Sequence, residues 1–264
     1  ASEMDLVHQK TSFSPVISEA FDRSNGIYDT EQGHIIAQGE LGLPIFLGVM
    51  QETTREVIEH RQDLEPGDVV IVNDPYFGGT HLMDVKMVKP FYYQGELWAY
   101  LSNTGHWSDT GGMVPGGFCA TATEIQQEGL RLPPVKLVRR GELINDVVDI
   151  IHSNVRVPDE RIGDLRAQLG ACGVARKGLI QLCEQYGRDE VMRYSDGLMD
   201  YADQRASEEF RKIPDGVYEG LTWTDTDGNG ATDIPIRAKI TKNGADIHVH
   251  YSGGPPSTGS FNAT

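Results

Sequence analysis

Apolar and polar positions repeat with two different periods along the 264-residue chain, and each change of period marks an expected element. Residues 3–11 and the stretch VMQETTREVIEHRQDL at 49–64 have the spacing of amphipathic helices. The run VVIVNDP predicts a buried strand that ends at Pro75, and NGIYDTEQGHIIAQG predicts shorter strands upstream. The stretch KMVKPFYYQGELWAYLSNT predicts two strands joined by a turn at Gln94 and Gly95.

The second half of the chain changes character twice. Residues 111–134 contain many loop-forming residues, and long irregular segments in compact domains are usually functional. Two consecutive helices follow at about 158–213, the first beginning at Pro158 and the second bounded by Pro214. Residues 215–251 then alternate with period two and carry turn signals at Gly228 and Asn243-Gly244, which predicts a β-meander.

Together these elements predict an α+β fold with mixed sheets, helices and a long loop-rich active-site segment. We expect three regions: an α/β region with the candidate site at 1–157, a helical hairpin at 158–213 and a β-meander at 214–264. The first residues read as the middle of a helix, and the last residues follow directly after a strand and a turn. We therefore expect an N-terminal part of a larger chain, whose meander continues into a C-terminal half.

Composition narrows the partners that we expect. With 23 Lys and Arg against 39 Asp and Glu, the net charge of −16 disfavours binding to nucleic acid. No apolar run is long enough to span a membrane, and the N-terminal residues lack the pattern of a secretory signal. The three cysteines (Cys119, Cys172 and Cys183) lack metal-type spacing, so we interpret them as buried reduced thiols in a cytoplasmic protein.

Two histidine stretches carry the candidate chemistry. In GGTHLMDV, His81 and Asp84 are three residues apart behind paired glycines, and in SNTGHWSDTGG, His106 and Asp109 repeat this spacing. Each stretch follows an expected strand, so His81, Asp84 and His106 can form a site of two histidines and one carboxylate with an open position. Asp109 would be a fourth ligand or would orient a ligating histidine. Alternatively, the histidines bond loop backbones and the aspartates cap turns, and spacing alone leaves both interpretations open.

Other candidate motifs are weaker. DTDGNG at 225–230 begins like a calcium loop, but Ile236 stands where a bidentate glutamate is required, so we expect a hairpin turn. Cys119 lies among small residues and lacks a nearby histidine, which favours packing over a nucleophilic role. His248 and His250 alternate on one expected strand face, which we interpret as exposed. No G-x-x-x-x-G-K-[ST] motif occurs, so a nucleotide would be bound elsewhere.

Five blocks of sequence, in order, resemble one protein family. They are NDPYFGGTHLMDV, GHWSDTGGMVPGG, EIQQEGLRLPPVKL, NVRVPDERIGDLRAQLGAC and YSGGPPSTGSFN. They are similar to blocks of the hydantoinase B/oxoprolinase family, which includes the large subunits of acetone and acetophenone carboxylases. The resemblance spans nearly the whole chain.

The resemblance implies a B-type subunit that carries a divalent metal, Zn or Mn, on His81, Asp84 and His106. It also implies a hetero-oligomer with a hydantoinase A-type ATPase subunit, which would bind the ATP. The implied reaction is ATP-dependent opening of a cyclic amide such as a hydantoin, a lactam or 5-oxoproline; the alternative is ATP-dependent carboxylation of a ketone. Asp109 and Glu128 lie in family blocks and are candidate catalytic residues beside the ion or the substrate.

Overall fold

The computed structural model describes residues 1–254, apart from the side chain of Leu47, and separates them into two units. Of the described residues, the first unit comprises Ala1–Phe118 and Glu128–Arg188, and the second comprises Cys119–Gln127 and residues 189–254. The boundaries of these two units differ from those of the three expected regions, because the helix that begins at Pro158 packs on the N-terminal sheet. The end of the sequence block YSGGPPSTGSFN, together with the rest of residues 255–264, lies outside the described residues.

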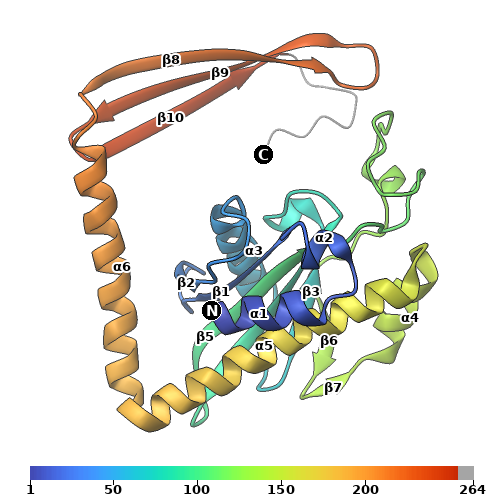
Figure 1. Ribbon diagram of the computed structural model, residues 1–264, viewed down its shortest axis with the longest axis vertical. Coiled ribbons are helices and arrows are strands. Elements are labelled where there is room, and N and C mark those ends of the chain that lie inside the picture. The colour runs from blue at the N-terminus through green and yellow to red at the C-terminus, as the bar shows by residue number, and fades with distance from the viewer. Residues whose placement is uncertain (255–264) are drawn as a thin grey trace. The chain divides into compact units, whose positions relative to one another are not determined.

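The first unit is built on a seven-stranded sheet in the order β2-β1-β5-β4-β3-β6-β7 (Figure 1). Every strand pair recorded in residues 1–254 is antiparallel. The α+β class is therefore confirmed, whereas the prediction of mixed sheets is wrong. Tight turns enforce antiparallel pairing in the β4–β5 and β6–β7 hairpins, and the non-consecutive pairs β1–β5 and β3–β6 are antiparallel as well. The strands are β1 (Arg23–Tyr28), β2 (Ile35–Gln38), β3 (Val69–Val72), β4 (Asp84–Tyr93), β5 (Glu96–His106), β6 (Val135–Arg139) and β7 (Glu142–Leu143).

Both faces of this sheet are covered, and the alternation of side chains along β3 shows it. Val69 and Ile71 pack with residues of α4 (Asn145–Asn154) and α5 (Pro158–Tyr186). Val70 and Val72 point the other way and pack with α3 (Phe46–His60). Burial on two faces explains why β3 reads as a continuous apolar run in the sequence.

The remaining elements of the first unit are short or lie along the sheet. The helices α1 (Ser2–Thr11) and α2 (Pro15–Ser18) lie on the α5 side (Figure 1), and the 3-10 turn η1 (Pro75–Phe77) follows β3. The expected β4–β5 turn is confirmed, with Gln94 and Gly95 at positive φ. The loop-rich segment is also confirmed: between β5 and β6 the only element is the 3-10 turn η2 (Ile125–Gln127).

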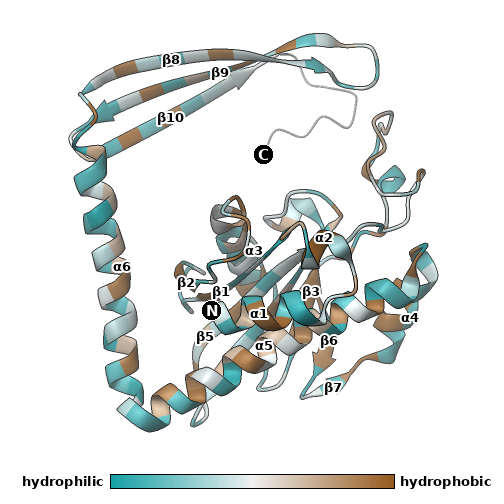
Figure 2. Cartoon of the chain, viewed as in Figure 1, coloured by the Kyte–Doolittle hydropathy of each residue, from teal (hydrophilic) through white to brown (hydrophobic). Residues whose placement is uncertain are grey.

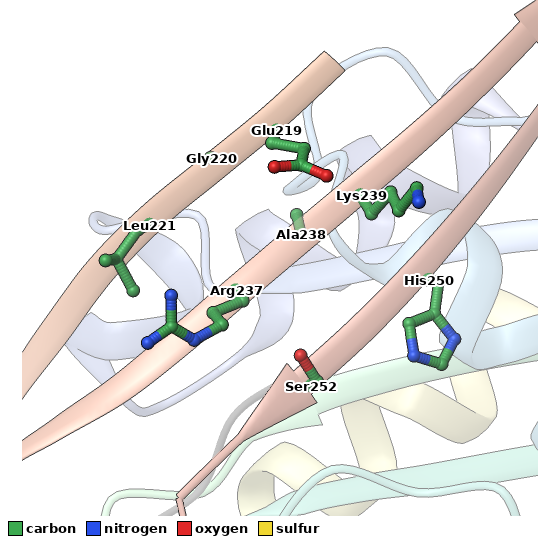
Figure 3. A pocket seen from close by; sticks show the side chains of 8 residues that line it. All are labelled: Glu219, Gly220, Leu221, Arg237, Ala238, Lys239, His250 and Ser252. Carbon is green, nitrogen blue, oxygen red and sulfur yellow. The ribbon is translucent and has the colours of Figure 1, made fainter. Parts of the chain in front are cut away.

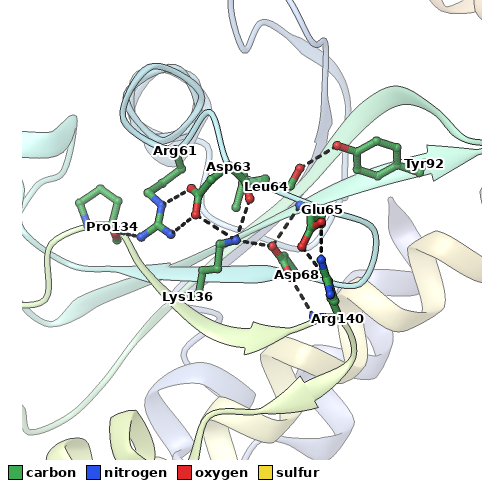
Figure 4. A network of polar contacts seen from close by, with 9 residues as sticks. All are labelled: Arg61, Asp63, Leu64, Glu65, Asp68, Tyr92, Pro134, Lys136 and Arg140. Carbon is green, nitrogen blue, oxygen red and sulfur yellow. Dashed lines mark hydrogen bonds and ion pairs between the residues drawn. The ribbon is translucent and has the colours of Figure 1, made fainter.

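A polar network fixes the turn that precedes β3 (Figure 4). The buried carboxylate of Asp68 lies 2.7 Å from the ammonium of Lys136 and accepts hydrogen bonds from the backbone N–H groups of Glu65 and Arg140. Lys136 also donates to the carbonyl of Asp63 at 2.7 Å. The network thereby ties the 61–68 turn to β6.

The second unit contains α6 (Arg188–Phe210), apart from its first residue, and a three-stranded sheet in the order β10-β9-β8. The strands β8 (Gly216–Thr226), β9 (Thr232–Asn243) and β10 (Asp246–Gly253) form the expected meander, with turns at Gly228 and Gly244. The hairpin turn expected in DTDGNG at 225–230 is confirmed, with the Asp227 N–H bonded to the Ala231 carbonyl, and so is the exposure of His248 and His250. Figure 2 shows hydrophilic and apolar residues interspersed along α6 and these strands, and most of their side chains are exposed.

The three cysteines are free thiols and are buried, as expected. None of the helices within residues 1–254 is long and apolar enough to cross a membrane.

Candidate metal centre

The register of two strands brings the first two candidate ligands together. The strand β4 begins at Asp84 and β5 ends at His106, and the antiparallel ladder pairs these two residues directly. Side chains at directly paired positions lie on the same face of the sheet. As a result, Nδ1 of His106 lies 3.2 Å from the carboxylate of Asp84, although the residues are 22 positions apart.

The third candidate ligand comes from the turn that leads into β4. The backbone N–H of Asp84 donates to the carbonyl of His81 at 3.2 Å, which closes the turn and places the imidazole beside the carboxylate. The Nε2 atom of His81 lies 3.5 Å from the other carboxylate oxygen of Asp84. His81, Asp84 and His106 are therefore brought together, and one ligand atom from each lies within 4.8 Å of the others.

The donor set fits a divalent ion. Ligands about 2.0–2.1 Å from a tetrahedral ion are roughly 3.3 Å apart, close to the two separations found here. The Nδ1 atom of His81 is buried and lacks a hydrogen-bond partner in the described structure. The three residues thus form a possible metal site with two nitrogen donors and one carboxylate.

The protonation states of two residues also suit an ion. Burial lowers the pKa of His81, so its imidazole is neutral at pH 7. Burial alone would raise the pKa of Asp84, but the contacts with His106 and the Lys86 charge outweigh it, so the pKa lies below its ordinary value. A neutral imidazole and an ionised carboxylate are the forms that bind metal.

Asp22 is a further acidic residue at the site, and it was missed in the sequence. Its carboxylate lies 3.6 Å from Nδ1 of His106, and its backbone carbonyl accepts a hydrogen bond from the His106 N–H. Burial raises the pKa of Asp22, and the Asp84 charge adds to that effect while His106 opposes it. The sequence signal that could have revealed it is its position directly before β1, which pairs with β5.

The carboxylate of Asp84 is held from several sides. The hydroxyl of Thr80 donates to it, and the buried ammonium of Lys86 donates to the Asp84 carbonyl at 3.2 Å. Burial lowers the pKa of Lys86 to about 8, while the Asp84 carboxylate opposes that shift. The positively charged ammonium of Lys86 thus lies close to the negatively charged Asp84.

Asn73, directly after β3, fixes the turn that carries His81. Its amide nitrogen donates to the carbonyls of Leu82 at 2.7 Å and Leu130 at 2.9 Å, and its oxygen accepts from the Leu132 N–H. The side chain is buried and fully bonded, so it ties the ligand turn to the segment before β6.

Asp109 and Glu128 lie outside the three-residue group found within residues 1–254. The carboxylate of Asp109 accepts from the backbone N–H groups of Gly111 at 2.7 Å and Gly116 at 3.0 Å, and it pairs with Arg156. Glu128 is half-buried, and burial raises its pKa. The structure thus gives Asp109 loop contacts, and the catalytic roles of both residues remain predictions.

A shallow hollow of about 280 Å³ lies on the three-stranded sheet of the second unit (Figure 3). Arg237 and Lys239 of β9 line it together with His250 and Ser252 of β10. All four side chains are exposed, which is typical of a solvated sheet face. It contributes no part of the candidate metal centre.

The fold and the site define an α+β chain in which two histidines and one carboxylate form a possible metal site at the end of an antiparallel sheet. The family model described as hydantoinase B/oxoprolinase matches residues 1–264, and the chain belongs to this family.

Relatives of known name agree with this assignment. The chain is 39% identical over 248 residues to caprolactamase subunit beta of Pseudomonas jessenii, which covers 94% of this chain and 42% of that protein. The crystal structure of the ATP-dependent caprolactamase from Pseudomonas jessenii matches 96% of this chain and 44% of its own, with a TM-score of 0.86 and 36% identity. The chain therefore spans less than half the length of these relatives.

A nucleotide-free structure of acetone carboxylase has a TM-score of 0.83 over 94% of this chain and 35% of its own. At 16% identity, this similarity shows a shared fold only.

Proposed function

We propose that the whole protein is the B-type, metal-bearing subunit of an ATP-dependent cyclic-amide hydrolase. The observation that carries the proposal is the convergence of His81, Asp84 and His106 in a chain of this family. The similarity to caprolactamase subunit beta over 94% of the chain supports lactams as a substrate class. Hydantoins and 5-oxoproline are further substrates to test.

The three residues would hold Zn²⁺ or Mn²⁺. When bound, such an ion polarises a carbonyl oxygen and makes a water molecule more acidic. The neutral imidazole of His81 and the ionised carboxylate of Asp84 supply nitrogen and oxygen donors without first losing a proton. Thr80 and Lys86 keep the Asp84 side chain and backbone in place.

Asp22 is placed to accept a proton at the edge of this group. Its carboxylate is partly exposed, with 27% of the side-chain surface accessible, and it lies beside His106. We assign Asp22 the removal of a proton from the attacking water, and Glu128 remains a candidate proton donor to the leaving nitrogen.

ATP would be bound by a partner subunit of the hydantoinase A type. This chain carries no P-loop motif, and a phosphate transferred to the amide oxygen would convert a stable amide into an activated intermediate. The relative from Pseudomonas jessenii is a beta subunit, which supports a complex of unlike subunits. We expect this complex in the cytoplasm, where ATP is available.

The test is to co-express the whole protein with its ATPase partner and to measure metal content and turnover. Ring opening of a lactam or hydantoin that requires ATP but not bicarbonate supports the proposal. Turnover of acetone or acetophenone that requires bicarbonate would instead identify a ketone carboxylase. A complex that contains less than about half an equivalent of metal would overturn the metal-bearing role.

A further inference from the structure

The aromatic ring of Phe118 lies against both histidines of the metal centre. Its centroid is 5.6 Å from that of His81 and 5.9 Å from that of His106, and its plane lies only 21° from that of His106. The imidazoles themselves are 5.1 Å apart, so the three rings form one contiguous aromatic surface. Nevertheless, 70% of Phe118 is exposed.

A large exposed aromatic residue beside two imidazoles needs a reason. Phe118 contributes little to the core because most of its surface remains in contact with water. The ring forms an apolar wall immediately beside polar ligand atoms. A few polar groups beside an apolar surface are typical of sites that bind small molecules.

The loop that carries Phe118 is fixed by a pair of charged residues. The guanidinium of Arg156 donates to the carbonyls of Gly111 at 2.9 Å, Val114 at 3.1 Å and Gly112 at 2.6 Å. The same guanidinium lies 3.1 Å from the carboxylate of Asp109. Arg156 thus binds backbone carbonyls of the 109–116 loop, and Asp109 binds backbone N–H groups of the same loop. The charges of the two side chains cancel.

The last turn before Phe118 is shaped by two glycines. Gly116 and Gly117 have φ values of 85° and 75°, which side chains other than glycine rarely adopt. A Cβ atom at Gly117 would clash with the sulfur of Met83, a residue of the ligand turn. The loop therefore passes directly over the ligand turn, which brings Phe118 to the histidines.

We infer that Phe118 is the apolar wall of the substrate site and selects cyclic amides with methylene-rich rings. Asp109 and Arg156 are positioning residues that act through Phe118, because they hold the loop that presents its ring. This inference rests on the proposed function, since it takes the ring-opening reaction at the metal centre as given. In this inference Asp109 acts by holding its own loop in place rather than by acting on the ion.

The alternative is that Phe118 only shields the imidazoles from water. In that case its removal would alter metal retention and would affect every substrate equally. A role in selection would instead change the ratio between substrates and leave the metal in place. The two alternatives therefore predict different activity ratios between substrates and different metal contents.

The experiment compares Phe118→Ala with the unaltered protein in the complex with the ATPase partner. Two substrates are used: a methylene-rich lactam such as caprolactam, and hydantoin, whose ring edge is mostly polar. We expect kcat/KM for the lactam to fall about 10- to 100-fold, mainly through KM, with a much smaller fall for hydantoin. Phe118→Leu should recover most of the lactam activity, because it restores an apolar side chain.

Metal content and fold are measured in the same samples. Phe118→Ala should retain the metal stoichiometry and thermal midpoint of the unaltered protein. Tyr186→Ala, which removes another exposed aromatic ring of the first unit, is the matched control and should leave both substrates unaffected. An equal loss for lactam and hydantoin, or a loss of metal, would overturn the assignment of Phe118.

The positioning role is tested by a double-mutant cycle with Arg156→Met. If Arg156 acts through Phe118, the lactam-to-hydantoin ratio of the double variant should match that of Phe118→Ala alone. Additive losses would overturn the coupling. If Arg156→Met fails to fold, Asp109→Asn replaces it in the same cycle. Inactivity of the unaltered complex on every cyclic amide would refute the proposed function, whereas an active complex indifferent to Phe118→Ala refutes only this inference.

Discussion

His106 and Asp84 occupy directly paired positions of the β4–β5 ladder, and their side chains lie 3.2 Å apart at the end of the sheet. The pairing means that the most regular part of the fold sets the geometry of the candidate metal centre. The ladder leaves only the His81 turn to be placed by loop contacts. That turn is closed by its own backbone hydrogen bond and fixed by Asn73.

The first prediction concerns the ligand from that turn. His81→Ala should abolish turnover and reduce bound metal to a small fraction of an equivalent, because two donors bind an ion less tightly than three. The thermal midpoint measured without metal should change little, since His81 belongs to a turn and to neither of the apolar clusters that pack on the two faces of β3. Elemental analysis and calorimetry check both expectations.

The matched control is His152→Ala, which removes an exposed histidine of the same unit. It should keep the full metal content and activity. Full activity of His81→Ala would contradict the assignment of the site.

The second prediction separates two acidic residues. Asp22→Asn should weaken metal binding by about 10- to 100-fold, because Asp22 contacts His106 and adds negative charge beside the ion. Asp109→Asn should leave metal affinity within about twofold, because the Asp109 carboxylate bonds the loop backbone and Arg156. Competition titrations with a chromophoric chelator measure both affinities. Equal weakening by the two substitutions would refute this division of roles.

Part of the candidate site could be predicted from the sequence, because local spacing and strand pairing act together. His81 and Asp84 are three residues apart and could be linked by spacing, and His106 follows from the expected hairpin of β4 and β5. Asp22 depends on the β1–β5 pairing, which joins segments about 80 residues apart and leaves no local pattern. Asp109 repeats the spacing of Asp84, but β5 has ended and the backbone amides of a loop compete for its carboxylate.

The fold, like the site, could be predicted only in part. Periodicity located the long helices and the meander, since each buries or exposes a regular face. It could not order the seven strands, because the apolar run of β3 is compatible with several neighbours. The placement of α5 on the N-terminal sheet also depends on long-range contacts such as that of Gln168, whose side chain donates to the Val85 carbonyl.

The third prediction concerns pH. Burial and, to a lesser extent, the nearby Arg23 charge together lower the pKa of His8 to about 3 from its ordinary value of 6.5, while the contact with Asn25 opposes this shift. The unfolded chain therefore binds more protons than the folded chain below pH 6.5, so stability falls as the pH decreases. Each pH unit between 6.5 and 3 should cost about 1.4 kcal/mol of the free energy of unfolding through this residue.

Urea unfolding of the whole protein at pH 7 and at pH 5 measures this effect. His8→Gln should reduce the dependence on pH by about 2 kcal/mol over this interval, because its side chain does not titrate. His152→Gln removes an exposed histidine and should retain the original dependence. An identical pH dependence in all three proteins would refute the prediction.

The fourth prediction concerns the network before β3. Burial would raise the pKa of Asp68, but Lys136 and the backbone N–H groups of Arg140 and Glu65 outweigh it, so the pKa lies below its ordinary value. The carboxylate is thus ionised at pH 7, and its stabilising contribution is lost only as the pH falls through that lowered pKa. One carboxylate oxygen faces both Lys136 and the Glu65 N–H, while the other accepts from Arg140.

An asparagine at this position cannot replace both oxygens. In either orientation its NH₂ group faces at least one donor, so Asp68→Asn should lower the free energy of unfolding by about 2 kcal/mol. Asp63→Asn alters a carboxylate that is 61% exposed in the same network, and it should cost less than about 1 kcal/mol. Denaturant unfolding at pH 7 measures both variants. The network lies at the start of β3 and the candidate metal centre lies beyond the other end of that strand, so metal content should not change in either variant. An equal loss of unfolding free energy in Asp68→Asn and Asp63→Asn would show that burial of Asp68 does not determine the strength of this contact.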